Sequence, residues 1–555
     1  MRTRRFFFTS GCALLFALSL AGCSKPSGNA TEEKDKAGQG TVPLFDNLGS
    51  YHRPVKTSSE LAQKYFDQGL RLTYGFNHDE AERAFREAAR IDPNCAMAWW
   101  GVAYVLGPNY NLPIDEARHQ KAVEAVQMAR SVQSNASDAE KGLIDAVAVR
   151  YSADPKADRA QLDRTYSAAM KELHARYPDD VDIAVLYAES LMDLKPWQLW
   201  THDGKPQEGT MEILTVLESA LARDANHPGA NHYYVHAIEA SPTADKGKAS
   251  AERLRTLVPG AGHLVHMPAH IFIRTGDYRG AIDANANAVT VDEAYFTKSK
   301  DQGVYPMMYY THNFQFLSTA AGMVGQSSRS IDSAKKAVGV VVPMIGHEPM
   351  VEYVLPWPLY AMTRNEKWDD VLAYQRPADN TPSTVAFWHF AQGVSQVAKG
   401  NLKDARAARV EFESARKKVP ADFMLNTNRA HALLDIAGSI LDARLAGAAG
   451  DRNAALNHWK KAVQIQDTLV YDEPPAWYYP VRESLGGEYL RAKRYQDAEA
   501  VFRRDLEINR NNPRSLFGLS EALRGLSKNA EADEVRRNFE REWQGAEVTL
   551  SVEKL

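Results

Sequence analysis

Three histidines lie within the eight residues 263–270, HLVHMPAH, of a 555-residue chain that has 16 histidines in all. His266 and His270 are four residues apart, so a helix would place both on one face. Neutral imidazoles are common metal ligands, and this segment is therefore a candidate metal site. Pro268 lies between the pair and would either bend a helix or mark its start. If the helix starts there, His263 and His266 would lie in the loop that enters it.

A second histidine pair precedes this one at a fixed interval. His232 and His236 are also four residues apart, and they precede His266 and His270 by 34 residues each. Glu239 follows on the same helical face. Because neighbouring helices stand about 8–10 Å apart, two pairs in one register could direct four imidazoles into one volume.

Further candidate ligands lie on either side of these pairs. An acidic pair four residues apart precedes them, and one more histidine follows in the segment THNFQF. The full set of expected metal ligands is His232, His236, Glu239, His263, His266, His270, Glu189, Asp193 and His312.

Imidazole combined with carboxylate suits a divalent transition metal, with zinc or copper first and iron as a further candidate. A catalytic zinc keeps three protein ligands and an open position, whereas a structural zinc takes four. The set could hold one ion with supporting residues around it, or two ions bridged by Glu189, Asp193 or Glu239. A histidine and acid pocket for an organic or peptide ligand remains an alternative, as does a separate structural role for each histidine.

Aromatic and basic residues form candidate surfaces for a partner or ligand. The segment YDEPPAWYYPVRESLG, residues 471–486, is either a rigid entry to a helix or a lid across from the histidines. The expected partner-binding or ligand-binding residues are Trp100, Tyr104, Trp197, Trp200, Trp477, Tyr478 and Arg482.

The element that must position these residues is a repeat. In YFDQGLRLTYGFNHDEAERAFREAARIDPN, small residues at Gly69, Ala81 and Ala88 flank Phe85, and Pro93 ends the unit. This pattern resembles the tetratricopeptide repeat, a 34-residue helix–turn–helix unit. The resemblance implies an all-α, right-handed superhelical solenoid of roughly eight to ten helix pairs, some with insertions.

The same pattern recurs at residues 276–288, 393–405 and 486–502, and a final unit follows from Pro513. If Ala281 is equivalent to Ala81, one repeat begins at Gly262. The resemblance then places the histidines of residues 263–270 on a helix face that lines the concave groove of such solenoids rather than the core.

The N-terminus has the features of an export signal. Arginines precede a short apolar run that ends in LAGC, which resembles a bacterial lipobox and implies lipidation of Cys23. The expected organisation is a signal peptide at 1–22, the lipidated cysteine and a flexible tether at 23–57, an N-terminal repeat array with the histidine and acid groove at 58–345, a C-terminal array at 346–545 and a tail at 546–555.

Composition narrows the class of function. The formal net charge is −4, and removal of residues 1–22 makes it −7. The chain therefore lacks the excess of basic residues that is typical of nucleic-acid binding. Cys95 is the one cysteine left besides Cys23, which excludes a disulfide framework. No phosphate loop, nucleophile elbow or paired-cysteine metal motif is present in the sequence. Proteins of the tetratricopeptide type are seldom enzymes and nothing indicates a substrate, so a role other than catalysis is favoured.

The sequence therefore predicts an exported protein that is lipid-anchored, at the outer membrane facing the periplasm, and that binds or delivers a divalent metal. It could instead present a metal-organised pocket to a protein or peptide partner in the cell envelope. One alternative is a metal-free scaffold for envelope assembly. Another is a metal-dependent hydrolase in which Glu239 or Glu189 acts as general base.

Overall fold

The computed structural model describes residues 42–555, apart from residues 155, 300–302 and 346–348. The expected signal peptide, Cys23 and most of the expected tether lie outside the described residues. Residues Pro43–Leu555 form one compact unit, which includes both of the expected repeat arrays. Within the described residues, no helix has the length and apolar character needed to cross a membrane.

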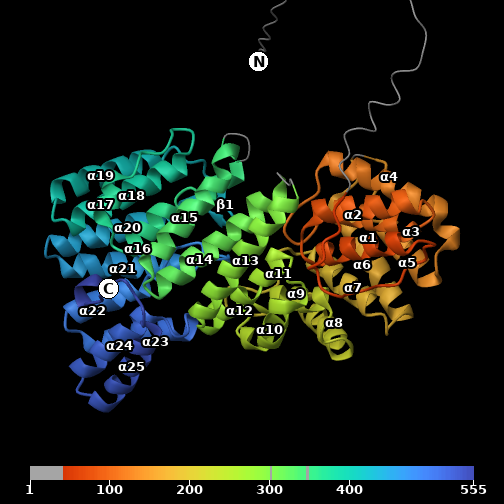
Figure 1. The fold of residues 1–555 in the computed structure, drawn as a ribbon. Helices are drawn as coiled ribbons and strands as arrows, with labels where there is room; N and C mark the ends of the chain where they lie inside the picture. Colours follow the sequence, from red (N-terminus) through yellow and green to blue (C-terminus); the bar gives the residue numbers. More distant parts are fainter. Residues whose placement is uncertain (1–41, 155, 300–302, 346–348) are drawn as a thin grey trace, which may run out of the picture. The chain divides into compact units, whose positions relative to one another are not determined.

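Most of the described residues are helical (Figure 1). The helices up to the first histidine cluster are α1 (Glu60–Tyr74), α2 (His78–Ile91), α3 (Ala96–Leu106), α4 (Glu116–Val132), α5 (Asp138–Ala148), α6 (Arg159–Arg176), α7 (Val181–Met192), α8 (Thr210–Arg223), α9 (Pro228–Ile238), α10 (Lys248–Leu257), α11 (Gly262–His266) and α12 (Pro268–Thr275). Those that follow are α13 (Tyr278–Lys298), α14 (Thr311–Met323), α15 (Ser327–Val341), α16 (Trp357–Arg364), α17 (Trp368–Ala373), α18 (Pro382–Ala398), α19 (Leu402–Arg416), α20 (Ala430–Ala448), α21 (Arg452–Gln466), α22 (Arg482–Arg491), α23 (Tyr495–Ile508), α24 (Pro513–Gly525) and α25 (Asn529–Glu542).

Short elements connect the helices. The 3-10 segments are η1 (Gln133–Asn135), η2 (Ala244–Gly247), η4 (Val342–Met344), η5 (Pro349–Tyr353) and η6 (Val552–Lys554), and η3 (Pro306–Tyr310) is a π-helical turn. In the described part of the chain, strands occur only as β1 (Met424–Leu425) and β2 (Asn428–Arg429), which pair antiparallel. The predicted all-α fold is therefore confirmed.

Helices that follow one another in the sequence pack as pairs. The packed pairs are α1 with α2, α3 with α4, α5 with α6, α7 with α8, α9 with α10, α12 with α13, α14 with α15, α16 with α17, α18 with α19, α20 with α21, α22 with α23 and α24 with α25, and α11 packs beside α12 on α13. The described residues contain twelve such pairs, more than the roughly eight to ten expected, because the expected insertions also form helix pairs.

The repeat pattern has a steric basis at its first unit. Phe85 on α2 is fully buried and lies against Gly69 on α1 and Gly101 on α3. A Cβ added at Gly69 would lie 2.6 Å from the Phe85 ring, and one at Gly101 would lie 2.5 Å from it. The aromatic ring therefore fills a space that exists only because its two neighbouring helices lack side chains there. The same arrangement recurs near the C-terminus with Phe502 between Gly486 and Gly518.

Both ends of the compact unit are fixed to the helices. Arg53, in the stretch assigned to the tether, donates to Asp180 at 2.8 Å and to Asp182 at 2.7 Å. Near the other end, the Glu547 N–H donates to the Gly325 carbonyl at 2.8 Å. Because of the Arg53 ion pairs, residues 43–57 pack on the helices rather than continuing the tether.

Candidate metal centre

The six histidines expected to bind metal lie on α9, α11, α12 and α14: His232, His236, His263, His266, His270 and His312. Pro268 does not separate the central three. Met267, between α11 and α12, has φ −50° and ψ −34°, and its N–H donates to the His263 carbonyl at 3.1 Å. The chain remains helical through the proline, so the histidines at 263 and 266 do not lie in an entering loop.

The rings form two groups of three. The first triad is His232, His236 and His263, and the second triad is His266, His270 and His312. Within each triad, one ligand atom from every residue lies within 4.8 Å of the others. The triads are adjacent, because the ring centroids of His263 and His266 are 5.8 Å apart. The structure thus brings together all six predicted histidines.

Hydrogen bonds orient two rings of the first triad. The Nδ1 of His232 lies 2.7 Å from the Tyr74 carbonyl oxygen, which can only accept, so Nδ1 donates and Nε2 keeps its lone pair. That Nε2 lies 3.1 Å from Nε2 of His263. The Nδ1 of His236 donates to Glu239 Oε1 at 2.9 Å in the same way, and its buried Nε2 has no hydrogen-bond partner within the described residues.

The second triad is oriented by the same means. His266 Nδ1 lies 2.6 Å from Oδ1 of Asn285, whose amide group donates to the Ala281 carbonyl at 2.7 Å. His270 Nδ1 lies 2.5 Å from Glu239 Oε2. The Nε2 atoms of His266 and His270 then face each other at 2.7 Å. In both triads, the ring anchored through Nδ1 leaves Nε2 to face a neighbouring imidazole: His263 for His232, and His266 for His270.

Glu239 connects the triads, since its two oxygens bind one ring of each. A carboxylate that accepts from Nδ1 of a histidine fixes the ring and raises the basicity of Nε2, an arrangement typical around metal ligands. Glu239 is one of the predicted ligands, and its observed bonds favour this supporting role.

Glu473 completes the centre and was not among the predicted ligands. It forms an ion pair with His270, and its ligand atom lies within 4.8 Å of those of His236, Glu239 and His270. It comes from the loop that precedes α22, so this part of residues 471–486 lies across from the histidines. The spacing of residues gave no signal for this contact, although the sequence analysis included the segment as a possible lid.

Burial keeps most of the imidazoles unprotonated. It lowers the pKa of five rings, with neighbouring histidines adding to the effect in most of them; the values are about 3 for His236 and His312, and well below the ordinary value for His232, His263 and His266. Burial also disfavours protonation of His270, but Glu473 and Glu239 outweigh it and raise that pKa to about 10. Five rings are therefore in the form that binds metals.

The centre is enclosed rather than open to a groove. The side chains of the first triad are at most 2 % exposed, and His312 is half-buried. Phe76 covers the first triad, with ring centroids 4.4 Å from His232 and 5.3 Å from His263. Phe316 lies 4.8 Å from the His270 ring. The resemblance placed these histidines on the face that lines the groove rather than in the core, whereas aromatic side chains from neighbouring elements cover them in the structure.

The predicted acidic pair belongs to another cluster. Asp193 Oδ2 accepts from Arg150 at 2.5 Å, and the Arg150 side chain is 1 % exposed. Burial raises the pKa of both Glu189 and Asp193, although Arg150 opposes this. Among the described residues, neither joins a group of ligand atoms with the histidines. Arg150, in the turn after α5, binds Asp193, and the sequence spacing gave no sign of this contact.

The predicted aromatic surfaces are mostly interior. Trp100 and Tyr104 stack on each other with centroids 5.3 Å apart, and both are buried. Trp200 donates to the Ala237 carbonyl at 2.7 Å, close to the end of α9, and Trp197 lies 6.0 Å from the His236 ring. The others pack elsewhere: Trp477 is 1 % exposed, Tyr478 stacks on Tyr360, and Arg482 pairs with Asp467. Within the described part of the chain, Trp197 is the member of this set whose ring lies against the histidines.

The fold and these contacts define an all-α helix-pair repeat protein with a buried histidine and carboxylate centre. No family model matches the sequence, and no curated protein matches it either. Among solved structures, human IFIT1 in a dimer with m7Gppp-AAAA is 12 % identical, with a TM-score of 0.31 over 87 % of this chain and 90 % of that one. Yeast Tom70 is 11 % identical, with a TM-score of 0.32 over 86 % and 96 %. The TPR domain of P58(IPK) is 12 % identical, with a TM-score of 0.20 over 84 % and 98 %. At these scores, the description of the fold rests on the helix pairs themselves.

Proposed function

We propose that this protein binds transition-metal ions in its buried centre, one at each histidine triad. The observation that carries the proposal is the orientation of the anchored rings. Tyr74, Glu239 and Asn285 accept from Nδ1 of four histidines, so that Nε2 is the atom left to bind a ligand. Without a cation, the buried Nε2 of His236 and Nδ1 of His263 lack a hydrogen-bond partner among the residues that the structure describes, which costs free energy.

Two ions fit the donor set better than one. The two triads share no residue, and each offers three imidazoles, the number found at zinc sites that keep a further position open. Glu239 then supports a ring of each site, and Glu473 is placed to neutralise charge beside the second. Nitrogen and carboxylate donors without thiolate suit zinc, Cu(II) or iron.

The enclosure supports binding, storage or delivery of metal over hydrolysis of a large substrate. A cavity of about 30 Å³ adjoins Glu473 and is lined in part by Gln315, Tyr353 and Asp472. It has room for water beside the centre. We extend the proposal to an exported, lipid-anchored protein that holds metal near a membrane surface and meets a protein or peptide partner in the cell envelope. The lipobox-like LAGC and the helix-pair array support this extension.

Metal content of the full-length mature protein, purified without a histidine tag, tests the proposal. Inductively coupled plasma mass spectrometry should find two transition-metal ions per chain, and none in the His232→Ala/His266→Ala variant. His389→Ala is the matched control, because His389 is half-buried and lies on α18 outside the centre. A folded wild-type protein that cannot be loaded with zinc, copper or iron would contradict the proposal and leave a metal-free scaffold.

A further inference from the structure

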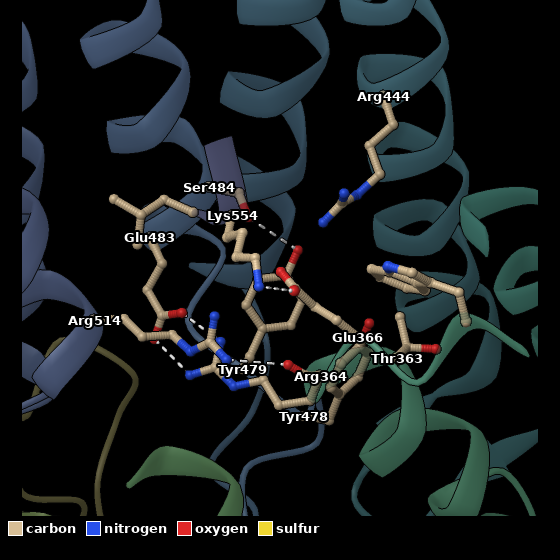
Figure 2. Close-up of a pocket in the computed structure, with 12 residues that line it drawn as sticks. Thr363, Arg364, Glu366, Arg444, Tyr478, Tyr479, Glu483, Ser484, Arg514 and Lys554 are labelled. Atoms are coloured by element: carbon tan, nitrogen blue, oxygen red, sulfur yellow. Dashed lines mark hydrogen bonds and ion pairs between the residues drawn. The ribbon is translucent and has the colours of Figure 1, made fainter. Parts of the chain in front are cut away.

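A second polar cavity lies far from the histidines in the sequence. It has a volume of about 30 Å³ and is lined by residues of α16, α20, α22 and α24 and by the end of the chain. Figure 2 shows Arg444 reaching toward it from one side and Arg364 and Arg514 from the other. The cationic groups on its wall are Arg364, Arg444, Arg514 and Lys554, and the acidic side chains are Glu366 and Glu483.

Two of the four cations are matched by the protein. Arg364 binds Glu483 through both terminal nitrogens, and the Nη2–Oε1 distance is 2.9 Å. Lys554 Nζ lies 3.0 Å from Glu366. Both acidic side chains of the cavity are therefore already engaged by a cation. The main-chain oxygen of Leu555, at the edge of the cavity, accepts from Arg491 at 3.3 Å.

The other two cations have no such match. Among the described residues, no carboxylate forms an ion pair with Arg444 or Arg514, and the buried Nε of each has no hydrogen-bond partner. Arg514 is 3 % exposed. Its guanidinium carbon lies 5.7 Å from the centre of the Trp543 ring, and its Nη2 donates to the Arg364 carbonyl at 3.1 Å.

The charge of Arg514 is poorly compensated in this setting. Burial and the neighbouring Arg364 lower the pKa of Arg514 to about 9, although Glu483 opposes them. Arginine is otherwise protonated under all ordinary conditions. A buried cation without an anionic partner is costly, and most such groups in proteins are paired.

We propose that this cavity binds a small oxyanion, a carboxylate or phosphate group, between Arg444 and Arg514. The planar guanidinium groups offer paired N–H donors that match the oxygens of either group. The hydroxyl groups of Tyr479 and Ser484 lie on the same wall; that of Ser484 donates to Tyr479 at 3.5 Å, which leaves the Tyr479 O–H to donate to the ligand. The volume admits the oxyanion group itself, so a larger ligand would have to extend toward the surface.

Thermal unfolding of the full-length mature protein, prepared without phosphate, tests this site. We expect phosphate or acetate to raise the melting temperature above that in chloride at the same ionic strength. Comparing phosphate with acetate shows which group the cavity prefers. The preferred anion is the one that raises the melting temperature at the lower concentration. Calorimetric titration should show that the anion binds the wild type with a dissociation constant about tenfold lower, or lower still, than that of Arg514→Gln or Arg444→Gln.

The controls separate binding from a structural role. Arg429→Gln removes an exposed arginine outside the cavity and should respond to anion as the wild type does. Arg514→Lys keeps a positive charge but lacks the planar fork, so it should fold and bind more weakly. No anion effect in the wild type, or the same effect in all variants, would overturn the proposal. If the anion has no effect while the metal content stays at two ions per chain, the anion site is refuted and the proposed metal centre is not.

Discussion

The histidine centre and the arginine cavity are both groups of polar side chains with buried atoms that have no hydrogen-bond partner within the described residues. The two sites differ in the charge of the ligand that would satisfy those atoms. At the centre, the buried Nε2 of His236 and Nδ1 of His263 have no hydrogen-bond partner among the described residues, and the partner we propose is a cation. At the cavity, the N–H groups of Arg444 and Arg514 have no acceptor at Nε, and the missing partner is an anion. The unmet hydrogen-bonding need of a buried cluster thus indicates the charge of its ligand.

A third cluster shows how buried charge looks when the protein satisfies it. Arg53 binds both Asp180 and Asp182, and Tyr74 donates to Asp182 at 2.5 Å. Burial alone would raise the pKa of Asp182, but Arg53 outweighs it and holds that pKa well below its usual range. This cluster requires no ligand, so it serves as the reference for the other two.

Removal of the proposed metal ions should produce the largest change in thermal stability. Because a metal bound only by the folded chain adds its binding free energy to stability, a chelator should lower the melting temperature of the wild type by several degrees or more. Differential scanning calorimetry with and without chelator measures this. The His232→Ala/His266→Ala variant should be insensitive to chelator, and equal sensitivity of the two proteins would contradict the assignment.

Arg53→Gln should produce the second-largest loss of stability. It leaves Asp182 buried with its main cation gone, and breaking such a pair costs about 3 kcal/mol. Arg514→Gln in anion-free buffer should instead leave stability unchanged or raise it, since it removes a charge that lacks a partner. Urea unfolding of both variants checks the contrast. A large loss for Arg514→Gln would show that the arginine cavity is a structural cluster like the reference.

Glu239→Gln should have a moderate effect on metal affinity. The amide keeps one acceptor oxygen and gains a donor, so either His236 or His270 loses its acceptor, and one triad loses the orientation of a ring. Loss of such supporting carboxylates typically weakens metal affinity about 10–100-fold. Competition titration with a metal indicator gives the two constants. The matched variant Glu218→Gln changes a carboxylate that binds Tyr234 outside the centre and should keep the affinity of the wild type.

The smallest effect concerns pH. Burial raises the pKa of Asp292 to about 7, although Tyr305 and Asn313 donate to it and oppose the shift. The folded state therefore holds a proton that the unfolded state releases above about pH 4. Stability should fall as the pH rises from about 4 to about 7. Asp292→Asn should flatten this slope in urea unfolding, and an unchanged slope would refute the assignment of the proton to Asp292.

Sequence periodicity was sufficient for the fold and for most of the centre. Repeat spacing placed His232 and His236 in register with His266 and His270, and the structure brings these rings together. This succeeded because one repeat length separates equivalent positions on adjacent helices. Their burial was not predictable, because Phe76 and the other covering aromatic residues come from other pairs.

Contacts between distant parts of the chain could not be read from the sequence. Glu473 reaches His270 from a loop, and Arg150 takes up Asp193 from a different helix pair. Neither partner has a fixed spacing from the residue it binds. The unmatched arginines of the cavity were missed for the same reason, since only the folded structure shows which acidic groups are already occupied.

The position of Glu473 gives the order in which the centre can be completed. During synthesis, all six histidines and Glu239 emerge before the loop that carries this carboxylate. An ion could enter the triads while that side is still unoccupied, and the arrival of the loop would then confine it. Docking of this loop would thereby set how slowly a bound ion escapes, independently of how tightly the imidazoles hold it.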